Sequence, residues 1–158
     1  MDISSLQWNH TNGASSNGNG MGSGNPGATL FSLLQAAHAL EGRLDTALGT
    51  VQLSMPKYSV LTVLATSGRP QTLGDLALRL SCVRSNMTQL VDRMEADGLV
   101  RRVSDATDRR VVLAEMTPLG SDRQAAGALQ VDRIQSEFAA ALSADDRHAI
   151  EHAVSQLR

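Results

Sequence analysis

The chain has 158 residues, of which 42% are hydrophobic, 19% charged and 3% aromatic, and this composition is typical of one globular domain. The 14 Lys and Arg residues face 16 Asp and Glu residues, so any nucleic-acid binding must come from a local cluster of basic side chains. The single cysteine, Cys82, excludes an intrachain disulfide and a structural zinc site built from several cysteines. No apolar run approaches the roughly 20 residues that cross a bilayer, and no secretory signal is evident, so we expect a cytoplasmic protein without a membrane partner.

The first 27 residues differ in composition from the rest of the chain. Between Asn9 and Gly27, 14 of 19 residues are Gly, Asn or Ser, which offer too little apolar surface to offset the entropy of ordering a backbone. We therefore expect a disordered tail over residues 1–27 and a folded domain over residues 28–158. Gly22 to Gly27 match the dinucleotide motif G-x-G-x-x-G, but no β-branched strand precedes them, so we interpret this match as accidental and expect no cofactor.

Apolar residues recur at helical spacing through most of the domain. A stripe from Leu30 to Val51 predicts a long first helix, and Pro56 opens a second helix over about 56–66. Thr72 is typical of the cap of a short third helix that ends near Leu80. A fourth helix over about 84–97 has its core face at spacings of three and four residues, namely Met87, Leu90, Val91 and Met94.

After the fourth helix, the sequence predicts a small β-wing and two further helices. Two β-prone runs, 99–103 and 111–116, flank a polar loop and indicate an antiparallel wing. Thr117-Pro118 opens a further helix, and Ser143 caps a last one. The fold class is thus mainly α with a small two- or three-stranded β-wing: a winged helix-turn-helix over residues 55–117, flanked by dimerisation helices over residues 28–54 and 118–158.

The fourth helix has the composition of a DNA recognition helix. Its outward residues are mostly hydrogen-bonding groups of the kind that read base edges in the major groove. Residues 79–110 hold seven arginines against five carboxylates, a local net charge of +2 in a chain of net charge −2. We predict contact with double-stranded DNA by Arg84, Ser85, Asn86, Thr88, Gln89, Arg93, Asp108, Arg109 and Arg110.

The same region resembles the MarR family of transcriptional regulators. The similarity extends from about residue 30 to the C-terminus and is most specific in LGDLALRL at 73–80, SNMTQLVDRMEADGLVRR at 85–102, DRR at 108–110 and TPLG at 117–120. The resemblance implies a homodimeric repressor that binds a pseudo-palindromic operator and is released by a small aromatic or phenolic effector. It further implies that Arg110 enters the minor groove, oriented by Asp108, and that Asp92 holds a nearby arginine. Two residues depart from the family pattern: Val83 replaces a frequent capping Ser or Thr, and Gln89 a frequent Arg.

Several alternatives remain open at the level of sequence. The winged helix could serve as a protein-interaction module, or Cys82 could act as a redox sensor at the start of the fourth helix, although a packing role fits its position better. His148 and His152 match an inverted zinc-protease motif, but a solvated helix face is the simpler interpretation, and we expect neither a metal nor an enzyme. His38 and Arg43 are weak candidates for an effector site.

Overall fold

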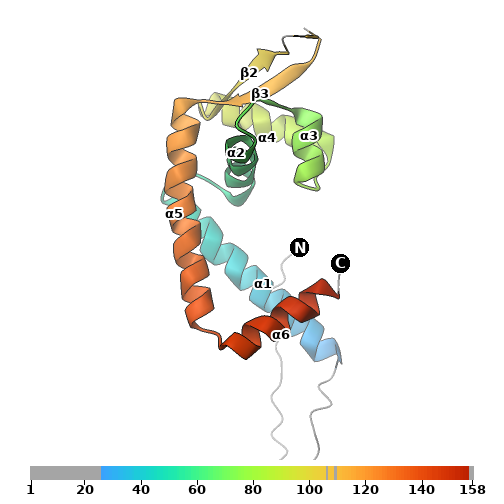
Figure 1. Ribbon diagram of the computed structural model, residues 1–158, viewed down its shortest axis with the longest axis vertical. Coiled ribbons are helices and arrows are strands. Elements are labelled where there is room, and N and C mark those ends of the chain that lie inside the picture. The colour runs from blue at the N-terminus through green and yellow to red at the C-terminus, as the bar shows by residue number, and fades with distance from the viewer. Residues whose placement is uncertain (1–25, 106, 109, 157–158) are drawn as a thin grey trace, which may run out of the picture.

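The computed structural model describes residues 26–156 except 106 and 109 and shows two parts joined by long helices (Figure 1). At one end of the molecule a compact lobe combines three helices with a small sheet, and at the other end the long helices and the last helix form an arm. In chain order the elements are α1 (Pro26–Gly49), α2 (Met55–Ser67), β1 (Gln71–Thr72), α3 (Leu73–Arg79), α4 (Arg84–Ala96), β2 (Val100–Ser104), β3 (Val112–Met116), α5 (Pro118–Ala140) and α6 (Ala144–Ser155).

The lobe is organised around one hydrophobic core to which each of its elements contributes. The predicted core face of α4 is confirmed, since Met87, Val91 and Met94 are buried and Leu90 is half-buried. These side chains pack with buried residues of α2, α3 and the sheet, namely Val60, Leu61, Leu64, Leu76, Ala77, Val100 and Ala114. The packing fixes α4 across the lobe and leaves its other side exposed.

The sheet has three antiparallel strands in the order β1-β3-β2. β2 pairs with β3 over five residues, from Val100 opposite Met116 to Ser104 opposite Val112. β1 pairs with the other edge of β3 through Gln71 and Thr72. The two long strands extend from the lobe as the wing (Figure 1).

Local sequence signals explain where the helices begin and end. The Thr72 hydroxyl accepts a hydrogen bond from the backbone N–H of Asp75 at 3.0 Å, which confirms the predicted cap of α3. Gly98, with φ of 71°, lies just past the end of α4 in the left-handed region that favours glycine. At the start of α6, Ser143 and Asp146 form the reciprocal hydrogen bonds of a capping box.

Two predicted boundaries of the first helix need correction. α1 begins at Pro26, inside the predicted tail, because proline suits the first turn of a helix. It ends at Gly49, although the apolar stripe continues to Val51, because the chain turns at Gln52 with φ of 59°. The sheet has three strands, as the prediction of two or three allowed, and the position of the two-residue β1 carries no periodic signal in the sequence. The G-x-G-x-x-G match at 22–27 lies largely outside the described residues.

The arm consists of α1, α5 and α6 and has few buried side chains. α1 packs on α5, and an ion pair joins Arg43 to Glu137 at 2.6 Å between the Nη2 and Oε2 atoms. α6 has no buried residue among those described. Within the described part of the chain, no helix is long and apolar enough to cross a membrane.

Candidate nucleic-acid interface

The exposed side of α4 carries the residues predicted to contact DNA. Arg84, Ser85, Asn86, Thr88, Gln89 and Arg93 are all exposed, whereas the apolar side of the helix is fixed in the core. Two of these side chains donate hydrogen bonds to backbone carbonyl oxygens of α4. Thr88 Oγ1 donates to Arg84 O at 3.1 Å, and Arg93 Nε donates to Gln89 O at 3.3 Å. The Thr88 hydroxyl can still accept a hydrogen bond from a base amino group, and the Gln89 amide has both its donor and its acceptor available.

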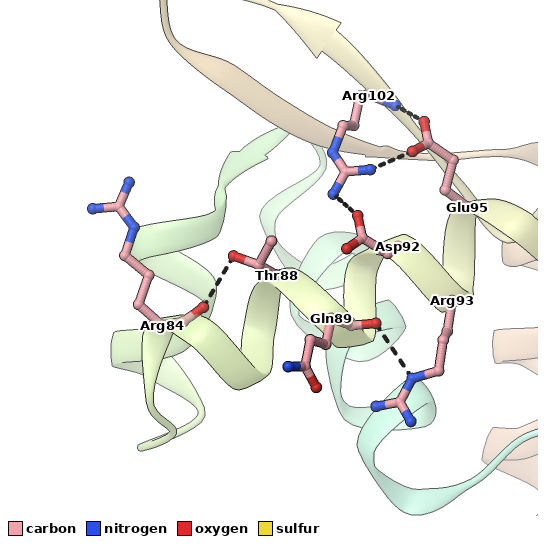
Figure 2. Close-up of polar contacts among 7 residues, drawn as sticks. All are labelled: Arg84, Thr88, Gln89, Asp92, Arg93, Glu95 and Arg102. Carbon is pink, nitrogen blue, oxygen red and sulfur yellow. Dashed lines mark hydrogen bonds and ion pairs between the residues drawn. The ribbon is translucent and has the colours of Figure 1, made fainter.

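Two acidic residues of α4 are held by a single arginine of the wing. Arg102, on β2, bonds to Asp92 Oδ1 at 2.5 Å and also pairs with Glu95, and its backbone N–H donates to Glu95 Oε1 at 3.0 Å (Figure 2). The bond to Asp92, reinforced by Glu95, raises the pKa of Arg102 above its ordinary value. Asp92 therefore holds an arginine as expected, and the identity of that arginine is new.

The position of this ion cluster separates charge on α4. In Figure 2, Asp92 and Glu95 face Arg102 and the wing, whereas Gln89 and Arg93 project from the other side of the helix. The positive charge of Arg102 reduces the combined charge of Asp92 and Glu95 from −2 to −1. The ion pairs also hold these carboxylates away from Gln89 and Arg93, so that side of α4 would repel an approaching phosphate less. Sequence alone did not single out Arg102, because its partners lie seven and ten residues away and depend on how the wing packs on α4.

Further contacts fix α4 within the lobe. Lys57 Nζ of α2 lies 2.6 Å from Asp97 Oδ2 at the carboxyl end of α4. Thr117 Oγ1 donates to the carbonyl oxygens of Gly98 at 2.7 Å and Leu99 at 3.1 Å, which ties the start of α5 to the same end of α4. The carboxyl end of α4, the start of β2 and the start of α5 thus meet at one junction.

The wing loop is organised by the carboxylate of Asp105. Asp105 Oδ1 accepts from the backbone N–H groups of Thr107 at 2.7 Å and Asp108 at 3.1 Å. These bonds, together with one from the Thr107 hydroxyl, lower the pKa of Asp105 below its ordinary value; the hydroxyl has the largest effect. The loop is therefore held in a defined turn while it remains exposed.

Asp108 acts on Arg110 in a different way from that expected. Asp108 Oδ1 accepts a hydrogen bond from the backbone N–H of Arg110 at 3.0 Å, and no ion pair joins these two described side chains. Asp108 thus fixes the backbone from which the exposed Arg110 side chain extends, and its role in orienting the guanidinium on DNA stays a prediction. Arg109 lies outside the described residues.

The two candidate effector residues do not share a cavity. His38 is exposed on α1, with Nδ1 3.8 Å from Glu41 Oε2, and lies beside Phe31 and Leu34 on a shallow surface. Arg43 lies in a separate groove between α1 and α5, where Glu137 pairs with it. The two residues lie on the same helix, but their five-residue spacing turns them to different sides of it.

A different groove borders the recognition helix. It has a volume of about 490 Å³ and is lined by the start of α2, the end of α3 and the Gln89–Arg93 side of α4. Cys82 is half-buried in its wall and packs against the core, which agrees with the packing role favoured from sequence. The redox alternative is therefore not favoured.

The histidine motif near the C-terminus gains no support as a metal site. His148 and His152 lie on α6. Among residues 26–156 as described, no group of three or more His, Cys, Asp or Glu side chains is placed to hold a metal ion.

A helix-turn-helix whose second helix presents polar side chains, followed by a β-wing, defines a winged-helix protein. Residues 53–112 match the family model "MarR family". The chain is similar to the transcriptional activatory protein BadR of Rhodopseudomonas palustris, with 38% identity over 93 residues covering 58% of this chain and 53% of BadR. It is also similar to the homoprotocatechuate degradative operon repressor of Escherichia coli, with 25% identity over 80% of this chain and 84% of that protein.

Solved structures show the same fold. A mutant MarR from E. coli complexed with operator DNA aligns with a TM-score of 0.72 and 21% identity, covering 84% of this chain and 94% of that one. The organohalide-sensing regulator RdhR in its 2,4-dichlorophenol-bound form aligns with a TM-score of 0.76 and 20% identity, covering 94% of this chain and 88% of that one. The described residues thus have the winged-helix fold of these regulators, and the match to the MarR family model covers residues 53–112.

The shared fold confirms the predicted fold class, and the match of residues 53–112 agrees with the resemblance seen in the sequence. Both named relatives are transcriptional regulators by name. The chain spans about half the length, or less, of the curated relatives that it matches at 36–38% identity.

Proposed function

We propose that this protein is a sequence-specific DNA-binding repressor in which α4 reads the major groove and the wing contacts the minor groove. The observation that carries the proposal is the charge separation on α4: exposed Gln89 and Arg93 on one side, and the acidic residues held by Arg102 on the other (Figure 2). An exposed arginine such as Arg110 suits the negative potential of a narrow minor groove. The complex of an E. coli MarR protein with operator DNA supports this use of the fold.

We also propose a homodimer formed by the arm. The large apolar side chains of the arm are exposed in the single chain, which is unusual for a stable soluble surface. They include Leu30, Phe31, Leu33, Leu34, Leu129, Phe138, Ile150 and Val154. A two-fold dimer would cover this surface and present two recognition helices to half-sites about one helical turn, or roughly 34 Å, apart.

We further propose that a small aromatic or phenolic effector releases the repressor. RdhR was crystallised with 2,4-dichlorophenol, and one relative is named for the repression of an aromatic degradation operon. BadR is named as an activator, so the direction of regulation requires a direct test. The groove beside α4 suits an effector of this kind, because occupancy next to Gln89 and Arg93 would compete with base contact.

Selection of bound sequences from a random DNA pool, at two salt concentrations, tests the central proposal. We expect enrichment of an inverted repeat and an affinity that falls steeply with salt, because arginines displace condensed counterions. A reporter driven by that repeat then distinguishes repression from activation. No enriched motif and no salt-dependent binding would overturn the proposal and favour a protein-interaction wing instead.

A further inference from the structure

The residue immediately before α4, Val83, is an exposed valine. Val83 is the N-cap of α4, has an extended backbone with φ of −69° and ψ of 137°, and its side chain makes no capping hydrogen bond. Valine is among the poorest N-cap residues, since it leaves helical N–H groups without a side-chain acceptor. The residue is 66% exposed, so burial in the core does not account for it.

The backbone around Val83 is held firmly. Ser81 adopts a left-handed conformation with φ of 50°, and the N–H of Cys82 donates to Ala77 O at 2.9 Å. The carbonyl of Val83 in turn accepts from the N–H of Met87 at 3.1 Å. A β-branched side chain on a fixed backbone has few accessible rotamers, so it loses little entropy when it meets a partner.

The neighbours of Val83 indicate what that partner is. Arg84, Ser85 and Asn86 follow it and are exposed, and the N-terminal residues of a recognition helix are those that meet base edges. The thymine C5-methyl group is the apolar feature that a base presents in the major groove. An isolated apolar side chain among hydrogen-bonding ones is suited to that group.

Resting on the DNA-binding function proposed above, we infer that Val83 is a specificity-determining residue that packs its methyl groups against a thymine methyl in each half-site. The contact selects thymine over the other three bases at one position. It explains why the helix tolerates a poor cap.

Operators in which thymine is replaced by deoxyuridine test this inference, because deoxyuridine lacks only the methyl group and still pairs with adenine. Each thymine of the selected operator is replaced in turn, symmetrically in both half-sites. At one position the wild-type protein should lose affinity by about fourfold per half-site, the effect of removing one buried methyl group. The V83A variant should bind the thymine and deoxyuridine operators equally.

Two further variants separate this role from a structural one. V83S restores a capping hydroxyl and should raise the melting temperature while losing the discrimination between thymine and deoxyuridine. L78A removes another exposed apolar side chain of the same lobe, 80% exposed, and should leave the discrimination unchanged.

The inference is overturned if no deoxyuridine substitution weakens wild-type binding, or if V83A responds to it as the wild type does. Either result leaves operator binding itself intact. Failure of the wild type to bind any selected operator would instead overturn the proposed function.

Discussion

Arg102 shows how a single side chain sets the charge that the recognition helix presents. It lies 28% exposed between α4 and the wing, where it serves two carboxylates at once. Its removal would leave Asp92 and Glu95 unpaired on the helix that we propose approaches DNA phosphates. At the scale of residues, the proposed interface therefore combines groups that would contact DNA with one group that keeps opposing charge away from it.

The Gln89 side chain is predicted to carry base preference. We expect Q89A to change the selected sequence while its affinity for random DNA changes little, because a neutral amide contributes hydrogen bonds to bases and no counterion release. Competition binding between the selected operator and random duplex measures both quantities. Equal losses on the two DNAs would remove Gln89 from base readout.

The Arg110 side chain is predicted to contribute affinity without contributing stability. Because it is exposed and Asp108 contacts only its backbone, we expect R110A to weaken operator binding and to leave the melting temperature and the oligomeric state unchanged. The salt dependence of binding should also become shallower, by a slope of about 0.9 for each phosphate that the variant no longer neutralises. An unchanged operator affinity would place Arg110 outside the interface.

At the scale of elements, the junction between α4, β2 and α5 requires a glycine. A Cβ atom added at Gly120 would lie 2.1 Å from the carbonyl oxygen of Leu99, a backbone atom that cannot move aside. We expect G120A to lower the free energy of unfolding by about 3 kcal/mol, as for an overpacked core. Chemical denaturation measures the change.

A second glycine provides the matched control. A Cβ at Gly42, within α1, would meet nothing within 4 Å. Alanine is the better helix former by up to about 1 kcal/mol, so G42A should stabilise the chain or leave it unchanged. If both variants lost stability equally, the close approach at Gly120 would not be the cause.

The capping box of α6 gives a pH-dependent prediction. Hydrogen bonds from the Ser143 hydroxyl, and then from its backbone N–H, lower the pKa of Asp146 below the ordinary value of 3.8. The contribution of this carboxylate to α6 is therefore complete above pH 3.8 and is lost as the pH falls through the lowered value. NMR titration of the Ser143 amide should show this transition, and D146N should abolish it; a transition above the ordinary value would contradict the prediction.

Element identities followed from sequence because each long element has its own periodic signal. The core face of α4 is an example, since four apolar residues at helical spacing predicted it in full. β1 and the Arg102 pairs did not follow, because a two-residue strand has no period and an ion pair across seven or ten residues depends on tertiary packing. The bond from the Arg110 backbone to Asp108 did not follow either, because sequence spacing does not distinguish a backbone N–H from a side chain.

At the scale of the whole molecule, the lobe contains most of the buried core and the arm contains many of the exposed apolar side chains. This distribution predicts that substitutions in the apolar surface of the arm, and not in the lobe, weaken the proposed dimer. We expect L34D, on α1, to shift the protein toward monomer because it places a charge in the apolar surface that a partner would cover. Sedimentation velocity measures the shift.

An exposed leucine of the lobe provides the control for L34D. Leu78 is more exposed than Leu34, at 80% against 55%, but lies on α3, far from the arm (Figure 1). L78D should leave the oligomeric state unchanged. Dissociation by L78D, or an intact dimer in L34D, would contradict assembly through the arm.

The length of α5 has a mechanical consequence. Its 23 residues form a rod about 34 Å long that starts at the Thr117 junction and ends in the arm. Because the rod is anchored to the recognition helix, a tilt of about 5° would displace its far end by roughly 3 Å, comparable to the length of a hydrogen bond. In the proposed dimer, such a tilt would change the spacing of the two α4 helices relative to the pitch of DNA without disturbing the core of either part.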